Sequence, residues 1–185
     1  MNDEALVAKF WARDPDAIAE SKALYDTYCM YIAGNILHDR EDAEECLNDA
    51  LLAAWNSIPP QRPRNLKTYL GKLVREIAID RWRRKQAQKR ISEELLVPLS
   101  ELEDMVGSRE VEESAADGEL SLRISDFLRS LKKTERDVFV RRYWFYDPIA
   151  SICSRYGFSK GKVAMMLKRT RDKLAEYLEK EGYLK

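Results

Sequence analysis

The sequence predicts an all-α protein of two small helical domains, joined by an acidic flexible linker. Three observations lead to this prediction. Apolar residues recur at helical rather than strand spacing along nearly the whole chain. The length of 185 residues suffices for one ordinary domain or two small ones. The 32 basic and 32 acidic residues cancel in total, but they alternate in four blocks along the sequence.

These charge blocks indicate how the chain is organised. Residues 1–60 carry 4 Lys or Arg and 12 Asp or Glu, residues 61–90 carry 11 and 2, residues 91–120 carry 1 and 10, and residues 121–185 carry 16 and 8. Two basic segments separated by an acidic one are typical of a protein that binds a polyanion at two places. We expect domains at 1–90 and 121–185, with the linker at 91–120.

Three helices are expected in the first domain, at about 14–37, 39–57 and 66–88. Asp39 is placed to cap the second of them, and Pro59-Pro60 ends it. The first is expected to bury Ile18, Leu24, Tyr25, Tyr28, Ile32 and Ile36. The second has the stripe Ala43, Cys46, Leu47, Ala50, Leu51, Ala54 and Trp55. The third has the stripe Leu66, Leu70, Leu73, Ile77 and Ala78.

The acidic linker contains glycines and no long periodic stripe, and we expect only short helical turns around 95–102. Four helices follow, at 120–131, 134–143, 148–156 and 159–180. The last two form a predicted helix-turn-helix, with Gly157 at positive φ in the turn and Ser159 as N-cap. The inward face of the final helix is expected to hold Val163, Met166 or Met165, Leu167 and Leu174.

Several classes of protein are disfavoured by the sequence. No apolar run approaches the ~20 residues of a membrane span, and the acidic N-terminus does not resemble a signal peptide, so we expect a cytoplasmic protein with no membrane insertion. Cys29, Cys46 and Cys153 are widely spaced and His38 is the only histidine, which favours buried thiols over a metal site. No Gly-rich nucleotide loop, catalytic triad or metal cluster is visible, so we expect no cofactor and no enzymatic activity.

Both basic segments suggest nucleic-acid binding. In the helix-turn-helix, Lys160, Lys162 and Ala164 would reach base edges in the major groove, and Lys168, Arg169 and Arg171 would hold phosphates. A plain three-helix bundle with a solvated basic face is the alternative.

The segment 62–90 sets basic residues beside Tyr69, Trp82 and the amide of Asn65, a combination suited to unstacked single-stranded bases. The alternative makes both aromatics ordinary core residues. The second helix carries a stripe of acidic and apolar residues, namely Glu45, Asn48, Asp49 and Leu52. This stripe suits docking on a basic helical partner, or it is simply a solvated face.

Three motifs follow one another along the chain: DAEECLNDALLAAW (42–55), LKTYLGKLVREIAIDRWRRKQ (66–86) and LKKTERDVFVRRYWFYDPIASICSRYGFSKGKVAMMLKRTRDKL (131–174). Together they resemble sigma factors of the sigma-70 family, specifically the small two-domain extracytoplasmic-function (ECF) type. The first motif is similar to the helix that docks on the β′ clamp helices of RNA polymerase. The second is similar to the helix that recognises and melts the −10 promoter element, and the third to the helix-turn-helix that binds the −35 element.

The resemblance implies a non-enzymatic role in promoter recognition and transcription initiation. The implied partners are promoter DNA, core RNA polymerase through its β′ clamp helices and β flap, and a possible anti-sigma factor. Polymerase docking would fall to Glu45, Asn48, Asp49 and Leu52. The −10 element would be bound by a base-capturing loop with Arg62, Arg64, Asn65, Lys67, Thr68 and Tyr69, and by Lys72, Arg75, Arg81, Arg83 and Arg84 along the backbone. The −35 element would be bound by Ser159, Lys160, Lys162, Lys168, Arg169 and Arg171.

The chain departs from the family pattern at several positions. Asn48 replaces the usual Gln, Tyr69 replaces Trp, and Glu76 stands where Asn is frequent. In the last motif Lys162, Met165 and Met166 replace Thr, Ser and Arg, so the −35 contacts do not follow from the family pattern.

Other interpretations stay open. A stand-alone helix-turn-helix regulator would explain residues 121–185 but not the first two motifs, and a protein-interaction module that sequesters a regulator is a third reading. The linker either enters the nucleic-acid channel of polymerase, anchored by Leu95, Leu96 and Leu99, or is an idle spacer.

Overall fold

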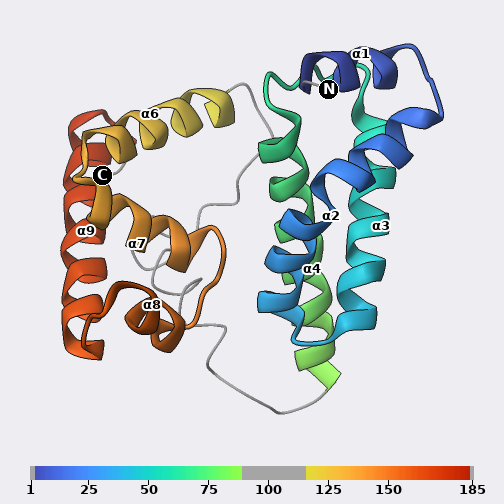
Figure 1. Cartoon of the computed structure of the whole chain (residues 1–185). Coiled ribbons are helices and arrows are strands. Elements are labelled where there is room, and N and C mark those ends of the chain that lie inside the picture. The colour runs from blue at the N-terminus through green and yellow to red at the C-terminus, as the bar shows by residue number, and fades with distance from the viewer. Residues whose placement is uncertain (1–2, 89–115, 184–185) are drawn as a thin grey trace. The chain divides into compact units, whose positions relative to one another are not determined.

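The computed structural model describes residues 3–88 and 116–183. Within these two ranges it contains eight helices and no strand (Figure 1), which confirms the all-α prediction. The chain divides into two compact units, residues 1–91 and 92–185. The helical turns expected around 95–102, and the three leucines proposed as linker anchors, lie outside the described residues.

The first unit is a bundle of three long helices with a short helix across one end (Figure 1). The long helices are α2 (Asp16–Leu37), α3 (Arg40–Ser57) and α4 (Leu66–Gln88). Each of them packs against the other two, and α1 (Asp3–Trp11) packs on α2 and α4.

The limits of α3 are those expected from its sequence. Asp39 caps the helix, because its carboxylate accepts a hydrogen bond from the backbone N–H of Asp42 at 2.9 Å. The helix ends at Ser57, just before the two prolines. The expected stripe from Ala43 to Ala54 is buried. Trp55 is only half-buried, with its ring 6.1 Å from that of Phe10 on α1.

The cores of α2 and α4 differ from expectation in detail. On α4 the buried apolar residues are Leu66, Leu70, Val74 and Ala78, whereas Leu73 and Ile77 are only half-buried. An i, i+4 series drifts by about 40° at each step, so this face turns gradually as α4 packs against two helices at once.

On α2 the expected burial of Leu24 is wrong, since half of this side chain is exposed. Leu24 lies one residue, about 100° of helix rotation, from the buried Tyr25. Ile18 and Tyr28 are half-buried, while Ile32 and Ile36 are buried as expected.

Helix α1 was not expected from the sequence. It buries Leu6, Val7 and Phe10 in the bundle core. Asp3 at its start accepts hydrogen bonds from the backbone N–H groups of Leu66 at 2.8 Å and Lys67 at 3.4 Å, and so caps α4 from 63 residues away. Its other carboxylate oxygen accepts from the hydroxyl of Tyr25. Burial and this hydrogen bond raise the pKa of Tyr25 to about 12.

The second unit comprises α6 (Ala116–Ser130), α7 (Lys133–Tyr143), α8 (Ile149–Tyr156) and α9 (Lys160–Lys180). The long α9 packs against the other three helices. Helix α6 begins four residues before the expected start at 120, inside the segment expected to be linker. The core is formed by Phe127, Val138, Phe139, Tyr143, Ile152, Val163, Leu167, Leu174 and Leu178.

The α8–α9 connection has the expected local chemistry. Gly157 has φ +65°, a left-handed conformation that ends α8 at low cost for glycine. The Ser159 hydroxyl accepts a hydrogen bond from the backbone N–H of Lys162 at 3.3 Å and so caps α9. Of the two methionines, Met166 is half-buried and packs on the core, while Met165 is 51% exposed.

The thiols lie largely in the core. Cys29 and Cys46 are buried, and burial raises the pKa of each to about 12. The thiol of Cys46 lies 3.4 Å from the carbonyl oxygen of Val74, to which it donates a hydrogen bond. The expectation of buried thiols is confirmed for these two, whereas Cys153 is only partly buried. None of the helices within 3–88 and 116–183 is long and apolar enough to cross a membrane.

Gly71 provides a test of the α2–α4 contact. A Cβ at this position would lie 2.4 Å from the hydroxyl oxygen of Tyr28, whereas a Cβ at Gly34 would have no atom within 4 Å. We expect Gly71→Ala to lower the free energy of unfolding by about 1 kcal/mol, because overpacking outweighs the gain in helix propensity. Gly34→Ala is the matched control and should raise it by about 0.5–1 kcal/mol. Denaturant unfolding of both variants measures the difference, and equal stabilisation would contradict the close contact.

Candidate functional site

The acidic stripe of α3 lies on the surface of the first unit. Glu45, Asn48 and Asp49 are exposed, and Leu52 is 55% exposed although it is a large apolar residue. The amide oxygen of Asn48 accepts a hydrogen bond from Lys22 Nζ of α2 at 3.0 Å. The four residues follow the i, i+3, i+4, i+7 spacing of one helix face, and the structure thus keeps them together as the sequence predicted.

The face of α4 that packs on α3 changes from apolar to basic along its length. Beyond Leu66, Leu70, Val74 and Ala78, this face of the helix continues with Arg81, three residues after Ala78, and with Lys85, four residues further on. The facing end of α3 is acidic, so the contact between the helices changes from apolar packing to ion pairing.

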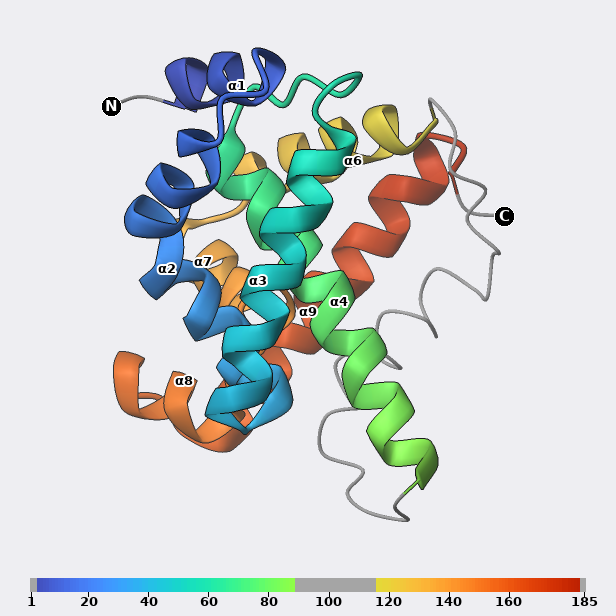
Figure 2. The same cartoon turned by 90° about the vertical axis from the view of Figure 1, so that its right-hand side faces the viewer.

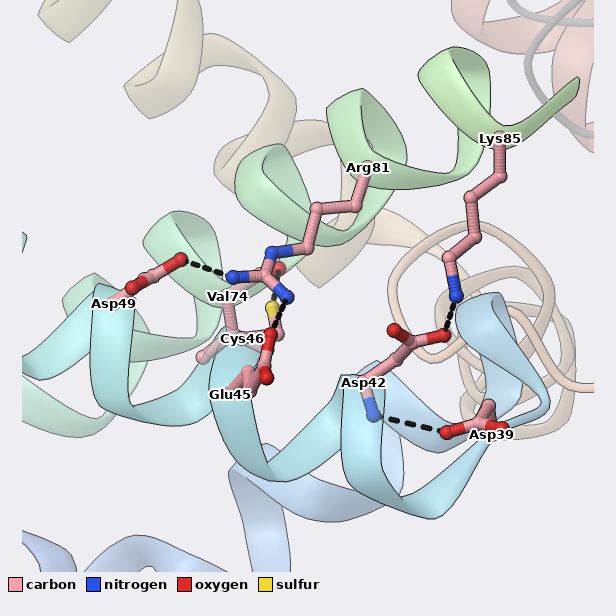
Figure 3. Close-up of polar contacts among 8 residues, drawn as sticks. All are labelled: Asp39, Asp42, Glu45, Cys46, Asp49, Val74, Arg81 and Lys85. Atoms are coloured by element: carbon pink, nitrogen blue, oxygen red, sulfur yellow. Dashed lines mark hydrogen bonds and ion pairs between the residues drawn. The ribbon is translucent and has the colours of Figure 1, made fainter. Parts of the chain in front are cut away.

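Arg81 lies between two acidic residues of α3 (Figure 3). One guanidinium nitrogen is 2.8 Å from Glu45 Oε2, and the other is 2.5 Å from Asp49 Oδ2. Lys85 forms an ion pair with Asp42, next to the α3 cap (Figure 3). The hydrogen bond to Glu45 raises the pKa of Arg81 above its usual value, so the group is charged at any physiological pH.

These contacts connect two predicted sites. Arg81 was predicted to follow DNA, and Glu45 and Asp49 were predicted to dock on a protein partner. Both terminal nitrogens of Arg81 are engaged by these carboxylates, and only 24% of its side chain is exposed. The geometry therefore favours a role for Arg81 in joining α3 to α4.

A second face of α4 carries most of the remaining predicted residues. This face lies on the side of the helix away from α3. Its members, at successive spacings of 4, 3 and 8 residues, are Thr68, Lys72, Arg75 and Arg83. Thr68, Lys72 and Arg83 are exposed and Arg75 is half-buried. Lys72 Nζ lies 3.7 Å from Glu76 Oε1 one turn further on, an exposed pair of little energetic weight. Arg84 is exposed on another side of the helix.

The loop before α4 is held by hydrogen bonds from several predicted site residues. The side chain of Asn65 caps α4 by accepting from the N–H of Thr68 at 2.7 Å. The Tyr69 hydroxyl lies 2.8 Å from Ser57 Oγ and donates to Gln61 Oε1 at 2.7 Å. These bonds give Asn65 and Tyr69 a structural role in fixing the loop.

The basic residues around this loop lie at its surface. Lys67 Nζ lies 4.8 Å from the ring centroid of Tyr28, and Arg62 Cζ lies 5.8 Å from that of Trp11. Arg62, Arg64 and Lys67 are exposed. The loop is thus a fixed backbone segment that carries the exposed Arg62 and Arg64, with the exposed Lys67 in the first turn of α4 beside it.

In the second unit, the outward face of α9 carries cations in its first turns. Lys162, Met165, Lys168 and Arg169 lie opposite the buried Val163 and Leu167. Lys162 Nζ lies 3.6 Å from the ring centroid of Phe158 in the turn. Lys160, Lys168 and Arg169 are exposed, and no acidic group among the described residues pairs with them. Ser159 serves as the helix cap described above.

Arg171 has a structural partner within this unit. One of its guanidinium nitrogens donates to the hydroxyl of the buried Tyr143 at 2.5 Å. Nearby, the buried Asp147 pairs with Arg141 at 3.2 Å, and its backbone carbonyl accepts from Arg142 at 3.2 Å. These contacts fix the α7–α8 connection and therefore the position of α8, on which α9 packs.

Residues 25–88 match the family model for sigma-70 region 2. The first domain is thus similar to sigma-70 region 2 over most of its length. This match supports a sigma factor of the sigma-70 family. The matched residues run from within α2 to the last residue of α4, so they include the acidic stripe of α3, the loop and the basic face of α4. No curated protein matches the chain. Helix α1 and the 131–174 motif lie outside the matched residues, and the motif stays a prediction.

The Arg81 ion pairs can be measured by a double-mutant cycle of Arg81→Met and Asp49→Asn. We expect a coupling free energy of about 0.5–1 kcal/mol in unfolding experiments at low salt, decreasing as salt screens this partly exposed pair. The control cycle combines Arg84→Met with Asp49→Asn, and it should be additive because the described structure shows no contact between these side chains. Additivity in the Arg81 cycle would refute the pairing.

Proposed function

We propose that this protein is a sigma factor of the ECF type, a dissociable subunit that gives core RNA polymerase its promoter specificity in the cytoplasm. The observation that carries the proposal is the sigma-70 region 2 match, which spans both the acidic stripe of α3 and the basic face of α4. A sigma factor needs such a pair of surfaces on one domain, because it binds a protein and DNA at the same time.

The acidic stripe is the proposed polymerase-docking surface. Glu45, Asn48, Asp49 and Leu52 would contact the β′ clamp helices. An exposed Leu52 beside carboxylates fits a partner that offers an apolar contact surrounded by basic side chains. Arg81 would act indirectly by holding Glu45 and Asp49 in place.

The −10 element is the proposed ligand of the loop and of the second face of α4. Arg62, Arg64 and Lys67 surround a loop whose backbone is fixed by Asn65 and Tyr69. Extracting a base from its stack costs a few kcal/mol, which contacts to the flipped base and to the phosphates would offset. The backbone of this strand would then follow Lys72, Arg75 and Arg83 along this face of α4, with Arg84 reaching it from the adjoining side of the helix.

The second domain is the proposed −35 module, with α9 as recognition helix in the major groove and β flap contacts to polymerase. Lys160, Lys162, Lys168 and Arg169 are exposed on its first turns, as DNA binding requires. Met165 at the centre of this face supplies an apolar contact suited to a thymine methyl group. Arg171, bonded to Tyr143, would orient α9 on its domain.

Linking two modest DNA sites raises the joint affinity through effective concentration, provided that the linker spans them.

Run-off transcription with core polymerase tests the proposal. We expect specific transcripts from genomic promoters, whose start sites then define the promoter sequence. A stand-alone regulator would bind duplex DNA without joining the polymerase. Failure to join core enzyme and to initiate at any promoter would refute the proposal.

Leu52→Lys is the sharpest test of docking, because Leu52 is exposed, whereas Asp49 also pairs with Arg81. We expect the affinity for core polymerase to fall by about tenfold or more, since an apolar contact is replaced by a charge that faces a basic partner. Leu24→Lys on α2 of the same domain, where Leu24 is 50% exposed, is the matched control and should leave this affinity unchanged. Unaltered core binding by the Leu52 variant would argue against docking through α3.

Arg83→Ala combined with Arg84→Ala tests the backbone contacts on α4. We expect the slope of log K against log [salt] for promoter binding by the holoenzyme to shrink by about 1.4–1.8, because each lost phosphate contact contributes about 0.7 on single strands and 0.9 on duplex. Titrations at several salt concentrations give the slope for each variant. An unchanged slope would remove both residues from the DNA interface.

A further inference from the structure

Helix α1 lies beside the loop that is proposed to capture a −10 base. Figures 1 and 2 both show the connection from α3 to α4 passing along α1 at one end of the bundle. The last residue of α1, Trp11, faces this loop, because its ring centroid is 5.8 Å from Arg62 Cζ. Helix α1 lies outside the residues that match region 2, so nothing in that match assigns it a role.

The exposure of Trp11 is not explained by packing. The neighbouring Phe10 is fully buried, contacts the ring of Trp55 and fills the core at this end of the bundle. Trp11 keeps 42% of its surface exposed. An indole left at the surface beside an exposed arginine offers a flat face on which another planar group can stack.

Helix α1 holds Trp11 in a defined position relative to the loop. Leu6, Val7 and Phe10 anchor the helix in the core. At its other end, Asp3 binds the backbone N–H groups of Leu66 and Lys67, the first residues after the loop. Because α1 is attached both to the core and to the start of α4, Trp11 needs little further ordering to bind a ligand.

We propose that Trp11 is a stacking platform for an unpaired base of the single strand that binds the loop, with Arg62 as its cationic partner. Aromatic rings and guanidinium planes are the groups on which proteins stack unpaired bases, and nearby cations attract the phosphates of the same strand. Arg62 and Arg64 are both exposed on this loop. The inference rests on the proposed function, and it adds to the nucleic-acid site a residue from outside region 2.

The test uses holoenzyme assembled from the full chain and core polymerase, with a fluorescent single-stranded oligonucleotide of the −10 region from a promoter mapped by transcript starts. We expect Trp11→Ala to raise the Kd for this oligonucleotide at least about fivefold, because stacking on an aromatic ring contributes substantially per base. Trp11→Phe should stay within about twofold of wild type. The salt slope should be unchanged for both variants, since no phosphate contact is lost.

Leu24→Ala is the matched control, since Leu24 is an exposed apolar residue of the same domain with no assigned role. If the Trp11→Ala variant binds the oligonucleotide with the same Kd as wild type, the inference is overturned. Equal weakening by the Ala and Phe variants, together with a lower Tm, would show a purely structural role and would overturn it as well. If wild-type holoenzyme neither initiates transcription nor binds the oligonucleotide, the proposed function itself fails, and this is seen before any variant is made.

Discussion

The contact between α3 and α4 is the feature on which the first domain depends. Over the first half of α4 this contact is apolar, and further along it becomes ionic through Arg81 and Lys85 (Figure 3). In the ionic part, Arg81 holds Glu45 and Asp49 in place, while both carboxylate side chains stay more than half exposed on the acidic surface of α3. The cations that α4 presents on its other side are left facing away from α3. One helix pair therefore provides an acidic surface and a basic surface that do not cancel each other.

Basic residues of this protein serve two physical purposes that look identical in the sequence. Arg81 and Arg171 bind carboxylates or a hydroxyl within their own domains. Arg64, Lys160 and Arg169 are exposed and pair with no acidic side chain in the described parts of the chain. Only the exposed, unpaired basic residues can bind phosphates and release counterions without first breaking a contact inside the domain. A count of charges in the basic segments therefore overestimates the surface available to DNA.

The loop before α4 obtains its shape from residues far apart in sequence. Asp3 caps the helix that follows the loop, Tyr69 bonds across it to Gln61 and to Ser57, and Trp11 contacts Arg62. Each of these contacts restricts the backbone before any ligand arrives. Such ordering would lower the entropic cost of binding a flexible single strand, as the proposed function requires. It also gives a physical reason for helix α1, which lies outside the residues that match region 2.

The sequence by itself determined the all-α class, the limits of α3, the turn at Gly157 and the Ser159 cap, because these depend on local periodicity and on side chains within a few residues of one another. It also indicated the two motifs that fall within the region 2 match. Only the tertiary structure decided that Val74 rather than Leu73 is buried, that Leu24 is exposed and that α1 completes the domain. It alone showed that Arg81 binds Glu45 and Asp49. These outcomes depend on which helices meet and at what rotation, and a change of one residue along a helix turns a side chain by about 100°.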